Sequence, residues 1–355
     1  MRVLHLISTL DRGGAETQLI QQVNFQKTRG LDVAICFLKG KGSLVEAAKG
    51  VSIKKVRGRF FLSQFFAFVF FVRKQKPDLI VAHLPRSELL AAVVSKITRI
   101  KFLVTKHNTE QFWPKGNKSI SRIMANFVDR SACSTICITR AIQDFLFSIH
   151  EANFQKSTVV HYGIQRDDRD NSRTEHTNSQ SGMTNIICVA RLEPQKNLSI
   201  LIELIPRIYD INPILEIFGD GSERDTLSFK IQKKKLEDRI KLRGVTDDIC
   251  LKMRSSDILI LPSLYEGLGL VLLEALDQGC LVVASRIPAI EEVLGSDYPL
   301  LFNPLSISEL EERVREALNV DRSWFSLYRL EVLERFTLEE QFGKTLNVYR
   351  SCLEK

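Results

Sequence analysis

Short apolar runs typical of β-strands recur along this chain and alternate with longer runs typical of α-helices. This alternation predicts parallel sheets, because each helix returns the chain to the edge where the next strand starts. The strand-like runs form two series with a polar segment between them. The first series comprises 3–7, 33–38, 79–83, 101–105, 134–139 and 158–161, and the second comprises 185–190, 214–218, 240–242, 258–261 and 281–284.

A chain of 355 residues is too long for one ordinary hydrophobic core. Residues 165–184, between the two series, are almost wholly polar, which is typical of a linker or an exposed loop. We therefore predict two doubly wound α/β domains, residues 1–164 and 185–337, which face each other across a cleft. Residues 338–355 follow as a last helix, with Leu338, Phe342, Leu346 and Tyr349 on one face.

Charge is distributed unevenly between the two halves. Residues 1–164 contain 25 Lys and Arg against 10 Asp and Glu, a net charge of +15, whereas residues 165–355 carry −7. The first half is therefore expected to meet an anionic partner. The sequence contains no helix-turn-helix, zinc-finger or aromatic RNA-binding pattern, so we expect no nucleic acid and favour an anionic membrane surface.

The cysteine content and the N-terminus point to a cytoplasmic protein. The seven cysteines are scattered and odd in number, and the Cys133-x3-Cys137 pair has neither a second pair nor histidines nearby. We therefore expect reduced thiols and no zinc site. The first eight residues are predicted to form a β-strand and not a signal peptide.

The run 263–284 carries the most functional information. It follows the strand-like segment 258–261 and opens a helix-like one, with Gly267 and Gly269 at the junction. Backbone N–H groups at a helix start bind anions. Glu266 and Glu274 flank this point with seven residues between them, and they are suited to accept hydrogen bonds from hydroxyl groups. An anion flanked by hydroxyls describes a nucleotide sugar. The alternative is a helix packed on the sheet, with both glutamates in water.

This run resembles the Glu-x7-Glu signature of retaining glycosyltransferases with the GT-B fold, closest to glycosyltransferase family 4. The resemblance spans most of the chain and includes the Gly13-Gly14-Ala15-Glu16 turn after the first strand. It implies transfer of a sugar from a nucleotide diphosphate donor to a hydroxyl, as on a growing lipid-linked glycan in surface polysaccharide or glycoconjugate assembly. It also implies that the last helix crosses back to the first domain, the alternative being a helix packed on its own domain.

The resemblance further implies roles for individual residues. Glu266 and His107 would be catalytic and would meet the donor sugar, and Glu274 would bind the ribose. The donor diphosphate would be held by Gly13, Gly14, Arg191, Lys196, Gly267, Leu268, Gly269 and Leu270. Gly219 and Val245 would border the nucleotide. His83 would line the acceptor side, and the other four histidines are given no role.

Some observations limit the resemblance or leave alternatives open. The family often has Asn-Gly-Ile-Asp where this chain has Tyr162-Gly163-Ile164-Gln165. No Asp-x-Asp motif follows a strand of the first domain, so we expect neither a divalent metal nor another cofactor. Arg191 and Lys196 could instead belong to a solvated charged loop. Rival functions are an NAD-dependent enzyme, which lacks the full glycine fingerprint, and a catalytically silent scaffold.

The segment 60–72 is rich in phenylalanine and is bracketed by basic residues. It is too short to span a bilayer. Phenylalanine beside lysine and arginine suits a helix that lies on anionic lipid. The alternative is a helix buried in the domain, and the two interpretations are compatible if one face of the helix is exposed.

Overall fold

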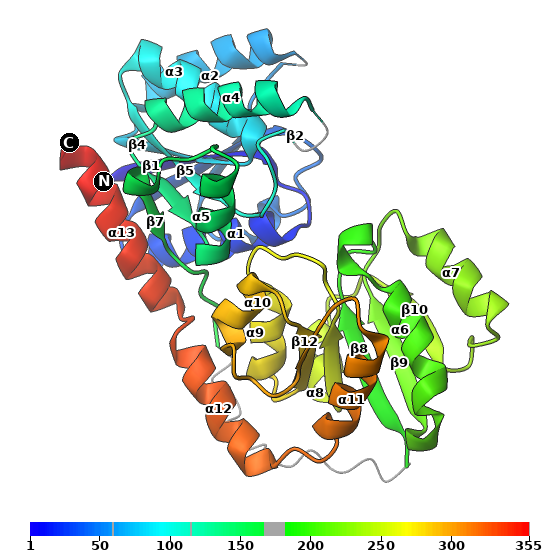
Figure 1. Ribbon diagram of the computed structural model, residues 1–355. Helices are drawn as coiled ribbons and strands as arrows, with labels where there is room; N and C mark the ends of the chain where they lie inside the picture. Colours follow the sequence, from blue (N-terminus) through cyan, green and yellow to red (C-terminus); the bar gives the residue numbers. More distant parts are fainter. Residues whose placement is uncertain (59, 114–115, 167–181, 355) are drawn as a thin grey trace. The chain divides into compact units, whose positions relative to one another are not determined.

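The computed structural model describes residues 1–58, 60–113, 116–166 and 182–354. The chain divides into two compact units: Met1–Gln165 with Thr337–Lys355, and Arg166–Phe336 (Figure 1). Each is a parallel α/β unit of the Rossmann-like type, as predicted. Most of the predicted polar linker, residues 167–181, lies outside the described residues.

The first unit contains a parallel sheet in the order β3-β2-β1-β4-β5-β6-β7. Its central strands β1 and β4 are buried on both faces, which explains their nearly continuous apolar sequences. The strands are β1 (Arg2–Thr9), β2 (Asp32–Lys39), β3 (Ser52–Lys55), β4 (Leu79–His83), β5 (Lys101–Lys106), β6 (Thr135–Cys137) and β7 (Ser157–Val159).

Helices cover both faces of this sheet. One face packs on α2, α3 and α4, which lie side by side in Figure 1, and the opposite face packs on α1 and α13. The helices and short 3-10 turns of this unit are α1 (Gly14–Thr28), η1 (Val45–Ala47), α2 (Phe61–Gln75), α3 (Pro85–Thr98), α4 (Lys118–Ser131), α5 (Arg140–Ser148), η2 (Phe154–Lys156) and α13 (Leu338–Glu354).

Helix α2, within the phenylalanine-rich segment, has one buried face and one exposed face. Phe68 and Val72 are buried against the sheet. On the opposite side Leu62, Phe66 and Phe70 are 67%, 63% and 72% exposed, and their spacing of four residues puts them on one stripe. The buried interpretation of this segment therefore holds for one face, and a role of the exposed face at a membrane stays a prediction.

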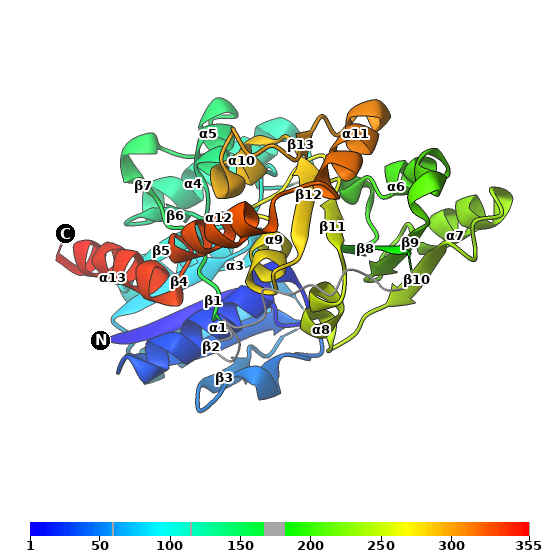
Figure 2. The same cartoon turned by 90° about the horizontal axis from the view of Figure 1, so that it is seen from below.

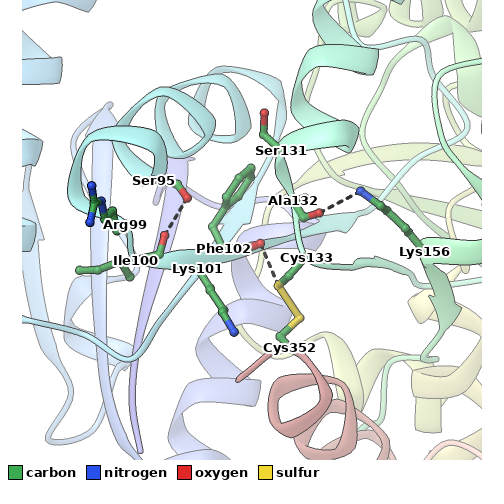
Figure 3. A pocket seen from close by; sticks show the side chains of 10 residues that line it. All are labelled: Ser95, Arg99, Ile100, Lys101, Phe102, Ser131, Ala132, Cys133, Lys156 and Cys352. Carbon is green, nitrogen blue, oxygen red and sulfur yellow. Dashed lines mark hydrogen bonds between the residues drawn. A yellow bond between two sulfur atoms is a disulfide. The ribbon is translucent and has the colours of Figure 1, made fainter. Parts of the chain in front are cut away.

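The last helix, α13, belongs to the first unit and packs against α1 and β5 (Figure 2). Phe342 packs edge-on against Phe25 of α1, and Glu339 forms an ion pair with Arg29. Near its end, a disulfide joins Cys352 to Cys133, which precedes β6, at the rim of a pocket (Figure 3). The expectation that all seven cysteines are reduced is therefore wrong for this pair, because residues 219 positions apart become neighbours once α13 docks.

The second unit contains a parallel sheet in the order β10-β9-β8-β11-β12-β13. Its strands are β8 (Thr184–Val189), β9 (Pro213–Phe218), β10 (Ile240–Gly244), β11 (Ile258–Leu261), β12 (Leu281–Ser285) and β13 (Leu301–Phe302). Its helices are η3 (Pro194–Lys196), α6 (Ser199–Leu204), η4 (Ile205–Ile211), α7 (Arg224–Lys233), α8 (Ile249–Arg254), α9 (Leu270–Asp277), α10 (Pro288–Leu294), α11 (Ile307–Ala317) and α12 (Arg322–Glu334).

Candidate functional site

Four loops of the second unit leave the same edge of its sheet, because all of its strands are parallel. Arg191 and Lys196 follow β8, Gly219 follows β9, Val245 follows β10 and Glu266 follows β11. β8 lies between β9 and β11, so the loops that carry Lys196 and Glu266 emerge from neighbouring strands. The carboxyl edge of an open α/β sheet is where ligands bind.

Two hydrogen bonds join the loop after β8 to the loop after β11. The backbone N–H of Leu264 donates to the carbonyl of Gln195 at 2.9 Å, and the Gln195 side chain donates to the carbonyl of Tyr265 at 2.7 Å. The neighbouring residues, Lys196 and Glu266, are thereby brought into contact. The two loops therefore form one platform.

Lys196 and Glu266 form an ion pair that is largely shielded from water. The Lys196 ammonium lies 2.5 Å from a carboxylate oxygen of Glu266, and the side chains are 13% and 8% exposed. The Ser263 hydroxyl donates to the same oxygen at 2.6 Å. The sequence predicted both charged residues for the site but not their contact. The pair neutralises two charges that would be costly to bury singly.

Gly219 permits close backbone contact between the loops after β8 and β9. A Cβ atom at Gly219 would lie 1.9 Å from the carbonyl oxygen of Ala190, and its φ of +133° is rarely adopted by other residues. Backbone bonds from Ala190 to Phe218 and from Leu192 to Asp220 hold the two loops together at 3.0 Å each. This glycine therefore shapes the base of the Arg191 loop, and its predicted contact with a nucleotide stays a prediction.

Helix α9 begins at Leu270, directly after Gly269, whose φ is +78°. No side chain caps this helix start, which leaves donors of the first turn for an anion. Leu268, within this turn, is buried. The predicted phosphate segment from Gly267 to Leu270 thus lies at an uncapped helix start, and its contact with a phosphate stays a prediction.

Glu274 lies one turn into α9 and is half-buried. Burial raises the pKa of its carboxyl. Within the part of the chain that the structure describes, no group hydrogen-bonds this carboxyl. Arg191 is exposed, and its guanidinium likewise has no ion-pair partner among the described residues. Both side chains therefore keep their hydrogen-bonding capacity, as does the exposed loop at Val245.

In the first unit, Gly13 and Gly14 form the start of α1, just beyond the carboxyl end of β1. A Cβ at Gly13 would lie 2.4 Å from a carboxylate oxygen of Glu16, whereas one at Gly14 would meet open space. His107 lies one residue beyond β5 at the same edge of the sheet. The structure thus places Gly13, Gly14 and His107 at the carboxyl edge of this sheet, and His83, the fourth predicted residue of the unit, ends β4.

His107 is buried, and both of its ring nitrogens have partners within the first unit. Nδ1 contacts the Tyr162 hydroxyl, and Nε2 lies 3.1 Å from Nδ1 of His83. His83 also contacts Nδ1 of His5 through Nε2, at 3.0 Å. His83 is only 1% exposed, and its role on the acceptor side stays a prediction. Its place is in the interior, between two other histidines.

Burial keeps these histidines neutral at pH 7. It lowers the pKa of His5 to about 4 and that of His107 to about 3. It also holds the pKa of His83 well below the usual range, with a further contribution from the adjacent His107. His5 had been given no role from the sequence alone. The available signal was that His5, His83 and His107 lie within, at the end of and directly after three strand-like runs, which the structure shows to be adjacent.

The described residues contain neither a metal-binding cluster nor a membrane-spanning helix. No group of three or more His, Cys, Asp or Glu side chains there is arranged to hold a metal ion. No helix in the same ranges is both long and apolar enough to cross a membrane.

Two protein-family models match this chain, one to each part. The family described as Glycosyltransferase Family 4 matches residues 12–168, and the one described as Glycosyl transferases group 1 matches residues 169–324. A glycosyltransferase of Methanocaldococcus jannaschii is 26% identical over 301 residues, which cover 79% of this chain and 76% of that protein.

An Escherichia coli enzyme, UDP-Gal:alpha-D-GlcNAc-diphosphoundecaprenol alpha-1,3-galactosyltransferase, is 23% identical over 230 residues. That alignment covers 61% of this chain and 59% of the enzyme, so the match leaves a large part of its length unaligned. The crystal structure of Anabaena HepE in complex with UDP matches with a TM-score of 0.82 at 21% identity, covering 99% of this chain and 100% of that one. At this identity the structural match establishes the fold.

Proposed function

Since the chain is a glycosyltransferase of the GT-B fold that resembles family 4, we propose that it transfers a sugar from a nucleoside-diphosphate donor to a hydroxyl acceptor with retention at the anomeric carbon. The observation that carries the proposal is the shielded Lys196–Glu266 pair. Glu266 lies four residues before the uncapped start of α9 at Leu270. Two structures that match this fold contain UDP or UDP-glucose, which supports the donor class.

The residues of the second unit divide between the parts of the donor. Glu274 accepts hydrogen bonds from the ribose hydroxyls, and Glu266 accepts from a hydroxyl of the sugar. Lys196 has three donor protons and uses one on Glu266, so the others remain for the diphosphate. Together with Arg191 and the N–H groups at the start of α9, it stabilises the charge that develops as the leaving group departs.

In the proposed reaction, the bond between the anomeric carbon and the donor phosphate oxygen breaks, and its electron pair leaves with the nucleoside diphosphate. The acceptor oxygen bonds to the same face of the sugar, which retains the configuration, and its proton goes to the leaving diphosphate. Arg191, Lys196 and the α9 N–H groups supply the positive potential for this step without a divalent ion. Of the first unit, His107 would meet the donor sugar, and Gly13 and Gly14 would hold the diphosphate.

We further propose that the first unit docks on anionic lipid to reach a lipid-linked acceptor. The support is the stripe of Leu62, Phe66 and Phe70 on α2, with the exposed Arg73 and Lys74 at the end of that helix. An exposed apolar stripe beside basic side chains suits the interface of an anionic membrane. The name of the E. coli relative, which includes diphosphoundecaprenol, is consistent with such an acceptor.

The donor can be identified with a panel of nucleotide sugars. The true donor should raise the unfolding temperature of the protein, because a ligand that binds only the folded state stabilises it. Incubation with acceptor should then give a product whose new anomeric proton has the same coupling pattern in NMR as the donor. An inverted anomeric configuration would overturn the retaining mechanism, and absence of binding by every nucleotide sugar would overturn the donor class.

A further inference from the structure

Six side chains in the first unit form one continuous buried chain of polar contacts. Gln26 on α1 connects Tyr349 of α13 to His5: its Nε2 is 3.3 Å from the Tyr349 hydroxyl, and its Oε1 is 3.0 Å from Nε2 of His5. From His5 the contacts continue through His83 and His107. They end at the hydroxyl of Tyr162. At this position of the sequence the family often has asparagine.

The strand register explains how this chain advances across the sheet. His5 of β1 is paired with Val81 of β4, two residues before His83. His83 is paired with Thr105 of β5, two residues before His107. Each step between strands therefore moves two residues toward the carboxyl edge and stays on the face that α1 and α13 cover. The chain thus leads from α13 to the predicted site residue His107.

The contacts are consistent with only one proton arrangement once the Gln26 amide is placed. Its carbonyl oxygen faces His5, so His5 must donate from Nε2. A neutral imidazole has one donor and one acceptor, so Nδ1 of His5 then accepts from Nε2 of His83. By the same rule, Nδ1 of His83 accepts from Nε2 of His107, and Nδ1 of His107 accepts from Tyr162. All three histidines carry their proton on Nε2.

We propose that Gln26, His5 and His83 are positioning residues that fix the tautomer and ring orientation of His107. A change at Gln26 should therefore alter the protonation of His107, although two histidines separate them. The inference rests on the proposed function only for the consequence in turnover. The tautomer itself is a property of the free protein and can be measured without any substrate.

The test is 15N NMR of the full-length protein labelled at histidine, which distinguishes a protonated from an unprotonated ring nitrogen. In the wild type, His5, His83 and His107 should all show protonated Nε2 and unprotonated Nδ1 at pH 7. Gln26→Leu removes the acceptor that sets the direction, so the ring shifts of His107 should change to those of mixed tautomers. Gln26→Glu retains an acceptor at this position and should preserve the Nε2 tautomer.

Gln22→Leu is the matched control, because Gln22 is also buried on α1 and is not a member of the chain. It should leave the shifts of His107 unchanged. Turnover should fall at least tenfold in Gln26→Leu, with the donor KM little changed, and recover in Gln26→Glu. Unaltered His107 shifts in Gln26→Leu, or different tautomers among the three histidines of the wild type, would overturn the inference even in an active enzyme. An inactive wild type with the expected shifts would instead count against the proposed function.

Discussion

Lys196 and Glu266, 70 positions apart in the sequence, are joined by an ion pair of 2.5 Å at the carboxyl edge of the second sheet. Each therefore holds the other in place before any ligand binds. A site residue that also satisfies a buried charge affects both stability and turnover when it is replaced. An exposed site residue affects turnover alone.

Lys196→Ala and Arg191→Ala separate these two cases. Both should lower kcat at least tenfold, because losing one fixed stabiliser of developing charge costs roughly 3 kcal/mol. Only Lys196→Ala should also lower the free energy of unfolding, by about 3 kcal/mol, since it leaves the Glu266 carboxylate buried without its cation. Kinetics and urea unfolding would check this. Near wild-type turnover in both variants would contradict the diphosphate assignment.

The two glutamates should differ in which part of the donor they bind. Glu274→Gln should weaken binding of the free nucleoside diphosphate, because the ribose belongs to the nucleotide. Glu266→Gln should spare the nucleoside diphosphate and weaken only the intact nucleotide sugar. Calorimetric titration with both ligands measures the difference. Equal losses of nucleoside-diphosphate affinity in the two variants would refute this division of roles.

Glu274 should also make stability depend on pH. Its pKa is raised in the folded protein, so its contribution to stability is present at low pH and is lost as the pH rises through the folded pKa. Glutamine stays neutral throughout. Glu274→Gln should therefore unfold at a higher temperature than the wild type near pH 8, and the difference should shrink toward pH 4. If the difference in unfolding temperature instead grew on acidification, the pKa of Glu274 would be lowered in the folded protein and not raised.

Chelation tests the proposed use of protein cations in place of a metal. Turnover should be unchanged after dialysis against EDTA, since Arg191, Lys196 and the start of α9 supply the positive potential. Addition of magnesium or manganese should then have little effect. Complete loss of activity, restored by either ion, would show that a metal takes part.

Membrane docking should depend on charge and on the apolar stripe of α2. Reversal of Lys54, Lys55, Arg73 and Lys74 to glutamate should release the protein from anionic vesicles, because each basic residue near anionic lipid contributes on the order of 1 kcal/mol. Salt should weaken wild-type binding in the same way. Donor binding should be unaffected. Co-sedimentation with vesicles of phosphatidylglycerol or phosphatidylcholine measures the binding.

Replacements of Phe66 and Phe70 by serine should weaken binding to the anionic vesicles as well. Phe229→Ser is the control, since Phe229 is 64% exposed on α7 of the second unit. Equal binding to neutral and anionic vesicles, or none to either, would leave α2 without a role at the membrane.

The sequence could predict the central strands because their residues are buried on both faces and form uninterrupted apolar runs. It missed β3, an edge strand whose Lys54 and Lys55 are exposed, and β13, which has only two residues. The pattern of apolar residues is weak or short in both cases. A strand can be predicted from the apolar pattern only where tertiary packing buries its side chains.

For the candidate site, the sequence could likewise predict which residues lie near one another but not which of them are in contact. Parallel strands place Lys196 and Glu266 at one edge, so their proximity follows from the topology. Their contact depends on the two hydrogen bonds of Gln195, which no local pattern encodes. His5 was missed because an isolated histidine in an apolar strand is usually a core residue. Its significance depends on Gln26 and on Tyr349, 323 positions from Gln26.

The Cys133–Cys352 disulfide closes a covalent ring that contains the whole second unit. The second unit is an insertion, since the backbone leaves the first unit after Gln165 and rejoins it at Thr337. The segment before the insertion and the segment after it belong to the same unit, and the disulfide is a second covalent link between them besides the backbone of the insertion itself. A protease that cuts once within the second unit would therefore leave a single molecule of unchanged mass apart from one added water, and only a reductant would separate the two pieces.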